Sequence, residues 1–225
     1  PYPMVINKGK GAALLANPEK VIKILDVVIP KIKPEISVKV RLGYENKTDI
    51  ETFLNIIKPY PIQEVIIHAR TAVQMYNGTV DLDVFSNCIN RFNFTMTYNG
   101  DIHSLSDYKN FKIKFPDQNR IMLGRGLLMN PFLAEEIKTG EVKSKIDQLK
   151  ILKKFHNELF NKYTEILSGP AHTTARLKNL WSFLAFSFKN PKNIIKKVKK
   201  TKTVEKYEMA IEEIFNEEIW IFIIK

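Results

Sequence analysis

The sequence predicts an α/β fold in two parts, a strand–helix alternation followed by an all-helical domain. Over the first 140 residues, short β-rich segments are each separated from the next by one helical pattern, which is typical of a parallel sheet. After about residue 141 the strand patterns stop, and apolar residues recur every three or four positions, as in amphipathic helices. We therefore expect one domain over residues 1–140 and a second over residues 141–225.

The predicted elements of the first domain follow one another at regular intervals. The strands are expected at 36–42, 64–68, 94–98 and 121–124, and the helices at 18–29, 48–58, 81–91, 104–114 and 130–138. A capping residue precedes a proline or an acidic first turn at four of the helix starts, namely Asn17, Thr48, Ser104 and Asn130. An open four-stranded sheet can be complete. However, a helix precedes the first strand, which favours the second half of a (βα)8 TIM barrel, strands five to eight.

Composition limits the kinds of protein that this chain can be. The 225 residues are 44% hydrophobic, enough for a core, but no apolar run approaches the roughly 20 residues of a membrane span. The single cysteine, Cys88, excludes an intramolecular disulfide and a CxxC metal site, which fits a reducing compartment. The four histidines show no metal-ligand spacing. We expect a cytoplasmic monomer with neither a metal nor a membrane span.

The net charge of +11 is unevenly distributed along the chain. Residues 141–225 hold 17 Lys and Arg against 10 Asp and Glu, and the stretch 189–202 alone holds seven lysines. Such a stretch is either a solvated helix face or a surface that binds a polyanion, most simply nucleic acid. Composition alone leaves both interpretations open.

Polar residues cluster at the carboxyl end of every predicted strand. In chain order they are Lys39 and Arg41, His68 and Arg70, Asn99, Gly100 and Asp101, then Gly124, Arg125 and Gly126. Singly, each has a structural explanation: a snorkelling lysine, a core histidine or a tight turn. Together they favour a site, because the loops after parallel strands converge at that end. Glycine backbone amides and an arginine suit an anionic, phosphate-bearing cofactor.

Four ordered motifs resemble those of the tRNA-dihydrouridine synthases. They are "VKVRLGY", "IIHARTAVQMYNG", "YNGDI" and "IMLGRGLLMNPFL", and "HTTARLKNLWSFL" is similar to a segment of that family's helical domain. The opening "PYPMVINKGKGAALL" is similar to the family's glycine-rich loop. The resemblance implies an FMN-dependent TIM barrel followed by a helical tRNA-binding domain. Such an enzyme uses NADPH to reduce the C5–C6 bond of a uridine in tRNA.

The resemblance also implies roles for individual residues. Lys39 and His68 are expected to contact the flavin ring, and the rest of the cofactor site is expected to comprise Asn99, Gly100, Asp101, Gly124 and Arg125. The residues expected near the substrate uridine, or ordering its loop, are Arg41, Arg70, Gln74 and Tyr76. In the helical domain the expected RNA-facing residues are His172, Arg176 and Lys178.

The sequence departs from the family pattern at several positions. The family's acid is a cysteine just before the proline matched by Pro1, so we expect no catalytic residue in this chain and an inactive fragment. Cys88 matches no functional position and is expected to be a buried small hydrophobe. Ala69 and Met75 replace glycines of the family motif.

Two other functions remain open at this point. One is a tRNA-binding protein without catalysis, which would bind RNA but no flavin. The other is a different FMN-dependent TIM-barrel oxidoreductase acting on a small molecule. The basic helical part and "HTTARLK" argue against the second alternative.

Overall fold

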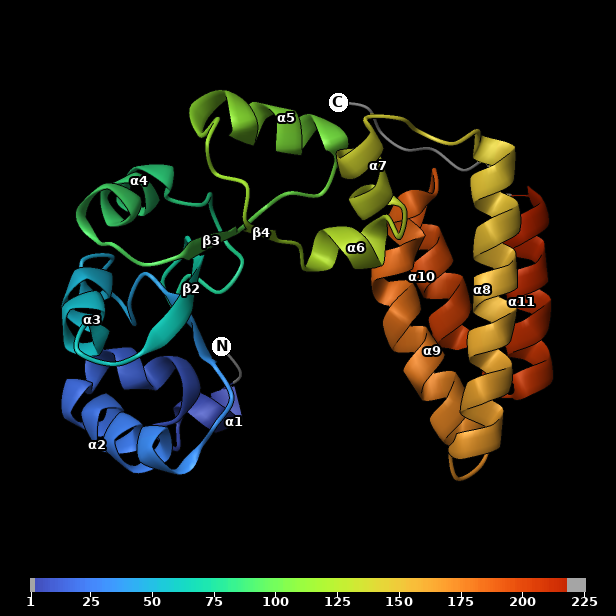
Figure 1. Ribbon diagram of the computed structural model, residues 1–225. Coiled ribbons are helices and arrows are strands. Elements are labelled where there is room, and N and C mark those ends of the chain that lie inside the picture. Colours follow the sequence, from blue (N-terminus) through green and yellow to red (C-terminus); the bar gives the residue numbers. More distant parts are fainter. Residues whose placement is uncertain (1–2, 218–225) are drawn as a thin grey trace. The chain divides into compact units, whose positions relative to one another are not determined.

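The computed structural model describes residues 3–217, and the chain divides into two compact units (Figure 1). The first unit comprises the residues up to Asp101 together with Lys112–Leu123. The second comprises Ile102–Phe111 and the residues from Gly124 onward. Each unit is described by itself below.

The first unit is built on a four-stranded parallel sheet, in agreement with the predicted alternation of strands and helices. Its strands lie in the order of the sequence: β1 (Ile36–Arg41), β2 (Ile62–His68), β3 (Met96–Asn99) and β4 (Ile121–Met122). The connecting helices include α2 (Pro18–Val28), α3 (Asp49–Ile57) and α4 (Leu82–Arg91), while α5 (Leu105–Lys114) is shared between the units. Before α2 come α1 (Pro3–Ile6) and the 3₁₀ turn η1 (Gly11–Ala16), and η2 (Ile29–Lys31) follows it. The observed α/β arrangement is consistent with part of a βα barrel.

The core of the first unit lies where the helices cover the sheet. Val65 and Ile67 of β2 are completely buried, as are Phe85 and Cys88 of α4. Burial, reinforced by the nearby Glu51, raises the pKa of the Cys88 thiol to about 12. The thiol is therefore protonated at neutral pH, and Cys88 is the buried small hydrophobe expected from the sequence.

Three of the four capped helix starts were predicted correctly in position, but only one of these three has the expected side-chain cap. The side chain of Ser104 accepts a hydrogen bond from the backbone N–H of Asp107 at 3.1 Å, as a capping residue should. The side chains of Asn17 and Thr48 make no such bond, so these two expected caps were wrong. Asn17 instead donates from Nδ2 to the carbonyl of Ala13 at 3.0 Å, because its side chain turns back toward η1.

The predicted helix over 130–138 corresponds to α7 (Leu133–Thr139), and a short helix that was not predicted, α6 (Arg125–Met129), precedes it. Asn130 and Pro131 separate the two helices. Proline has no N–H to donate, and Oδ1 of Asn130 accepts from the backbone N–H of Phe132 at 2.9 Å, which begins the new helix.

The second unit is helical, as predicted, and has its own core. From α8 onward its elements are α8 (Lys145–Ile166), α9 (Pro170–Leu184), the 3₁₀ turn η3 (Ala185–Ser187), α10 (Pro191–Lys200) and α11 (Val204–Glu217). The core contains the buried side chains of Leu177, Trp181, Phe188, Tyr207 and Ile211. Within residues 3–217, no helix combines the length and apolar character needed to cross a membrane. Helix α6 also packs on α9 in this unit, and the domain division at residue 140 stays a prediction.

Candidate functional site

The carboxyl ends of the strands align side by side, as the sequence pattern predicted. In the parallel register Arg41 lies beside His68, His68 beside Asn99, and Asn99 beside Met122. Side chains from β1, β2 and β3 that are far apart in the sequence are therefore brought into one row. This row is the starting point of the candidate site.

Lys39 and Asn99 are joined by a hydrogen bond within this site. The ammonium Nζ of Lys39 donates to Oδ1 of Asn99 at 2.8 Å, and Nδ2 of Asn99 donates to the carbonyl of Met122 at 2.8 Å. Partial burial of the ammonium, reinforced by the charge of Arg41, lowers the pKa of Lys39. The resulting chain of donors fixes the amide of Asn99 and places a cation at the end of the sheet.

His68 is buried among cations. Burial is the main cause that lowers its pKa to about 3, and the charges of Arg41, Lys39 and Arg70 act in the same direction. Asp101 opposes the shift but does not cancel it. The imidazole is therefore neutral at pH 7, with one ring nitrogen able to donate and the other able to accept.

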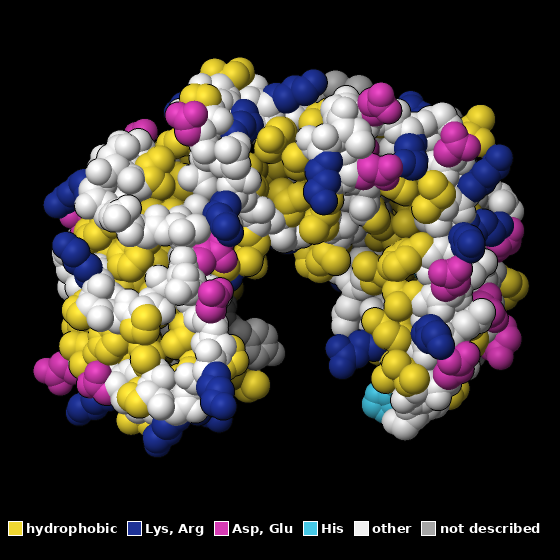
Figure 2. Space-filling model, viewed as in Figure 1, with side chains coloured by type: hydrophobic (Ala, Val, Ile, Leu, Met, Phe, Trp, Pro, Cys, Tyr) yellow, Lys and Arg dark blue, Asp and Glu magenta, His cyan; other side chains and the backbone are white. Residues whose placement is uncertain are grey.

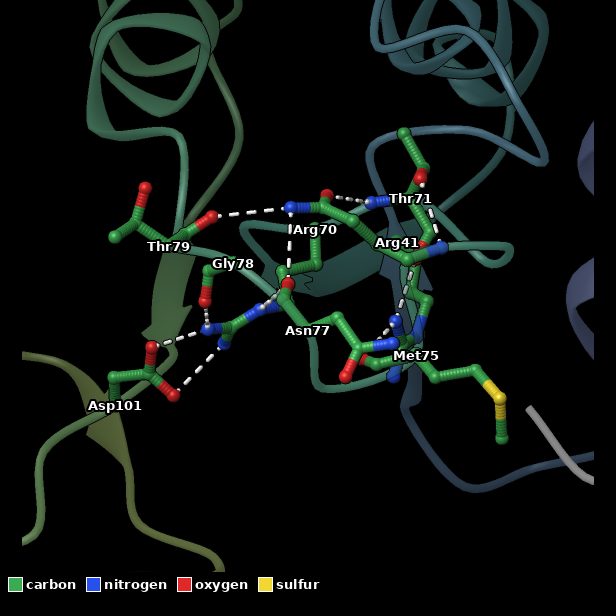
Figure 3. Close-up of polar contacts among 9 residues, drawn as sticks. Arg41, Arg70, Thr71, Met75, Asn77, Gly78, Thr79 and Asp101 are labelled. Atoms are coloured by element: carbon green, nitrogen blue, oxygen red, sulfur yellow. Dashed lines mark hydrogen bonds and ion pairs between the residues drawn. The ribbon is translucent and has the colours of Figure 1, made fainter.

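Arg41 supports the loop that follows β2, here defined as residues 71–79 and called the 71–79 loop. One terminal nitrogen of Arg41 donates to the carbonyls of Thr71 at 2.6 Å and Met75 at 2.8 Å (Figure 3). The guanidinium carbon also lies 5.7 Å from the ring centroid of Tyr76, within range of a cation–π contact. The Tyr76 side chain is 53% exposed, so the loop presents this ring outward.

Arg70 and Gln74 hold the same loop from within. Arg70 is 1% exposed and pairs with Asp101, and it also donates to the carbonyls of Asn77 and Gly78 (Figure 3). Gln74 donates from Nε2 to the carbonyls of Asn77 at 3.3 Å and Thr79 at 3.1 Å. The hydrogen bonds of these two side chains therefore order the 71–79 loop. The carbonyl acceptors have no signature in the sequence, which is why sequence reasoning did not name them.

Met75 occupies a backbone conformation that favours glycine. Its φ of +51° lies in the left-handed region, where a side chain costs about 1–2 kcal/mol. The family motif has glycine at this position, and the structure supplies the physical reason. Ala69, the other departure, is fully buried and has an ordinary φ, so its methyl group causes no backbone strain.

The glycines near the strand ends differ in how much room surrounds them. A Cβ on Gly100 would lie 2.7 Å from Cγ1 of Val80 and 2.8 Å from the hydroxyl of Tyr98, so any side chain there would force these neighbours to shift. In the second unit, a Cβ on Gly124 would meet nothing within 4 Å, so this backbone is open to a ligand. Arg125 follows it at the first position of α6.

The expected RNA-facing residues all lie on α9. His172 and Arg176 are exposed and one helical turn apart, so they share a face. Lys178 is only partly exposed, and its Nζ donates to the carbonyl of Thr201 at 2.6 Å, just after the end of α10. This bond connects α9 to the end of the lysine-rich helix, a link that the sequence did not reveal.

Comparison with known protein families agrees with the sequence motifs. The family model described as "Dihydrouridine synthase (Dus)" matches residues 1–219, nearly the whole chain. The chain belongs to the dihydrouridine synthase family. The residues gathered at the strand ends are thus those of a family member.

Three curated relatives show the extent of the similarity. A protein of Arabidopsis thaliana named "tRNA-dihydrouridine(47) synthase [NAD(P)(+)]-like" is 32% identical over 61% of this chain and 20% of its own length. A "Probable tRNA-dihydrouridine synthase" of Rickettsia conorii is 28% identical over 76% of this chain and 54% of its own length. A "tRNA-dihydrouridine(16) synthase" of Neisseria meningitidis serogroup B is 27% identical over 92% of this chain and 64% of its own length. The chain therefore spans less than two thirds of each of these relatives.

Proposed function

We propose that this chain forms the flavin- and tRNA-contacting part of a tRNA-dihydrouridine synthase. The reaction is the reduction of the C5–C6 double bond of a uridine in tRNA, with FMN as the bound cofactor and NADPH as the reductant. The single observation that carries this proposal is the juxtaposition of Lys39, Asn99 and neutral His68 at the carboxyl ends of the sheet. The family match and the relatives named as synthases support it.

The first unit is proposed to be four consecutive strands of a (βα)8 barrel. In the described part of the chain β1 is the terminal strand of the sheet, next to β2 alone. An apolar cavity of about 450 Å³ runs along it, lined by Leu15, Leu25, Val38, Val40 and Phe53 among others. A barrel would bring a further strand to this edge, and closure would bury that apolar surface.

The residues present fit an FMN group. Lys39 supplies a cation and Asn99 a held amide, and a reduced flavin carries negative charge along one edge of its ring. Within the second unit, the open backbone at Gly124 and the neighbouring Arg125 suit a phosphate group. When bound, FMN supplies the hydride for the pyrimidine ring. In this proposal Lys39 and His68 orient the ring, while Asn99 keeps the Lys39 ammonium in place.

The substrate side is assigned to the 71–79 loop. Arg41 and Arg70 are hydrogen-bonded within the protein, so their proposed role is to shape the loop. Tyr76 is the exposed aromatic side chain of that loop, and aromatic rings stack on bases extracted from RNA. Gln74 fixes the chain on both sides of Tyr76 through its bonds to Thr71 and Thr79.

The RNA backbone is proposed to contact the face formed by α9 and α10. Three of the five lysines on α8, at 153, 154 and 162, have acidic partners, and Figure 2 shows mixed charges over α8 and α11. On α10, by contrast, only Lys197 has an acidic partner among residues 3–217. Lys192, Lys196, Lys199 and Lys200 therefore remain available for phosphates, and the last two lie next to Thr201, whose carbonyl Lys178 contacts.

The test is a titration of this chain with FMN, followed by flavin fluorescence, together with a separate measurement of tRNA binding. Saturable FMN binding that Lys39→Met or Arg125→Ala weakens, but Lys31→Met does not, supports the flavin assignment. Dihydrouridine formed in unmodified tRNA incubated with the chain, FMN and NADPH, measured by mass spectrometry, would contradict the expectation that this chain alone is inactive. Binding of tRNA without any binding of FMN would replace the proposal with a non-catalytic RNA-binding function.

A further inference from the structure

We propose that Asp101 is a positioning residue that acts through Arg70 to hold the 71–79 loop. Asp101 follows β3, whereas the loop follows β2, so the pair links two segments at the end of the sheet. The loop's order is inferred from contacts alone. Only the consequence for a uridine near Tyr76 depends on the proposed function.

The contact between the two side chains is bidentate. One terminal nitrogen of Arg70 donates to Oδ1 of Asp101 at 2.8 Å, and the other donates to Oδ2 at 2.5 Å (Figure 3). Paired N–H groups matched to paired carboxylate oxygens define both distance and orientation. The planes of the two groups are thereby fixed relative to each other.

The same guanidinium is also hydrogen-bonded to the backbone of the 71–79 loop. Arg70 donates from a terminal nitrogen to the carbonyl of Gly78 at 2.7 Å and from Nε to the carbonyl of Asn77 at 3.4 Å (Figure 3). Four of its five N–H groups are thus engaged within the protein. Because Arg70 is 1% exposed, it is poorly placed to contact RNA and well placed to transmit the position of Asp101 to the loop.

Because Arg70 is buried, the conformation of the 71–79 loop depends on the Arg70–Asp101 pair. A buried guanidinium that loses its carboxylate is left with an uncompensated charge, so the side chain must move toward water. Movement of Arg70 would release the carbonyls of Asn77 and Gly78, the two residues after Tyr76. The order of the Tyr76 segment therefore depends on a carboxylate 31 residues away from Arg70 in the sequence.

The segment around Asp101 also includes Asn99, which takes part in the Lys39–Asn99 hydrogen bond of the candidate site. Asn99, two residues earlier, holds Lys39, and Asp101 itself has a φ of +33°, a left-handed conformation that aspartate tolerates better than most residues. The short stretch from Asn99 to Asp101, at the end of β3, thus fixes both a proposed flavin contact and the 71–79 loop. We assign the Asp101 carboxylate to the loop, and not to direct contact with the cofactor.

Hydrogen exchange on the 225-residue chain tests this inference without flavin or RNA. In Asp101→Asn the amide of Asn77, which donates to the carbonyl of Gln74 at 2.8 Å, is expected to exchange at least tenfold faster. The amide of Val65 in β2, which donates to Thr95, is expected to keep its rate. The matched control is Glu51→Gln, which removes a carboxylate from the exposed pair with Arg91 in the same unit. Unchanged exchange at Asn77 in Asp101→Asn would overturn the proposal.

Two further variants separate positioning from general loss of structure. Asp101→Glu keeps the carboxylate and is expected to restore much of the protection. In a double-mutant cycle with Arg70→Met, the double variant should exchange no faster at Asn77 than the faster single variant. Additive effects, or a failure of Asp101→Glu to restore protection, would mean that the two residues do not act as a pair. Faster exchange in a chain that binds no FMN would leave the positioning role intact while the proposed function fails.

Discussion

The ammonium nitrogen of Lys39 lies 2.8 Å from Oδ1 of Asn99, although 60 positions separate the two residues. The contact reaches from β1 to β3 across β2, whose His68 stands in register with Asn99. A lysine, a neutral imidazole and an amide with fixed orientation are thereby gathered at one end of the sheet. This arrangement is the basis of the first prediction.

Replacing Asn99 with alanine is expected to weaken FMN binding at least tenfold. The substitution removes the amide oxygen that accepts a hydrogen bond from Lys39, so the position of the Lys39 ammonium is no longer fixed. The measurement is a fluorescence titration with FMN. Asn93→Ala, at an exposed position before β3, is the control and should bind like the parent chain. Equal affinities for the two variants would remove Asn99 from the cofactor site.

Backbone strain at Met75 leads to a prediction about stability. Because φ is +51°, Met75→Gly is expected to have a free energy of unfolding about 0.5–1 kcal/mol higher than Met75→Ala. Both variants lose the side chain, so only the Cβ distinguishes them. Urea unfolding provides the two values.

The control for Met75 is the exposed Met209 within α11. In a helix interior glycine is worse than alanine by about 1 kcal/mol, so Met209→Gly should be less stable than Met209→Ala. The same order of stability at both positions would show that Met75 is not strained.

His156 makes the helical unit sensitive to acid. It is buried beside Tyr207 and Trp181; the indole N–H of Trp181 donates to the Tyr207 hydroxyl at 3.1 Å, and that hydroxyl lies 2.8 Å from Nε2 of His156. Burial lowers the pKa of His156 below its ordinary value of 6.5, although Asn157 opposes the shift. As the pH falls below 6.5, the unfolded chain therefore binds a proton that the native chain does not, and the free energy of unfolding decreases.

The comparison is between pH 7 and pH 5, with urea unfolding followed by circular dichroism. His156→Gln is expected to lose less stability over this interval than the parent chain, with a difference of up to about 1.4 kcal/mol per pH unit. His172→Gln, at an exposed position on α9, should behave like the parent. A loss in His156→Gln as large as in the parent would show that another group is responsible.

The lysines at the end of α10 are expected to contribute to RNA affinity through phosphates. Replacing Lys199 and Lys200 with glutamine should weaken tRNA binding and reduce the slope of log K against log salt concentration by about one for each phosphate that the lysines neutralise. Filter binding at several salt concentrations measures both quantities. The control removes the same charge from α8, at Lys153 and Lys154, which already pair with Glu212 and Glu158. Equally weakened binding in both variants would indicate non-specific attraction to the whole basic unit.

Local chemistry in the sequence was enough to predict much of this protein. The alternation of β-rich and helical patterns gave four parallel strands within a few residues of their observed bounds, because burial on a sheet or a helix imposes its own period. The polar residues at the ends of β1, β2 and β3 lie side by side as expected, because parallel strands share their direction. Helix α6 was not predicted, and the helix expected from residue 130 begins at Leu133, after the Asn130 side chain has accepted a hydrogen bond from the backbone N–H of Phe132.

Only the tertiary structure decided which groups meet. Arg41 and Arg70 have similar positions in the sequence, one at the end of β1 and the other just after β2. In the folded chain Arg41 donates to the carbonyls of Thr71 and Met75. Arg70 is instead buried and paired with Asp101. Backbone carbonyls leave no trace in the order of residues, and their positions depend on how strands and loops pack. The sequence by itself therefore determined the fold class, the family and the list of candidate residues. Packing decided which of them face a ligand and which hold the loop, because a buried cation must find its acceptors within the protein.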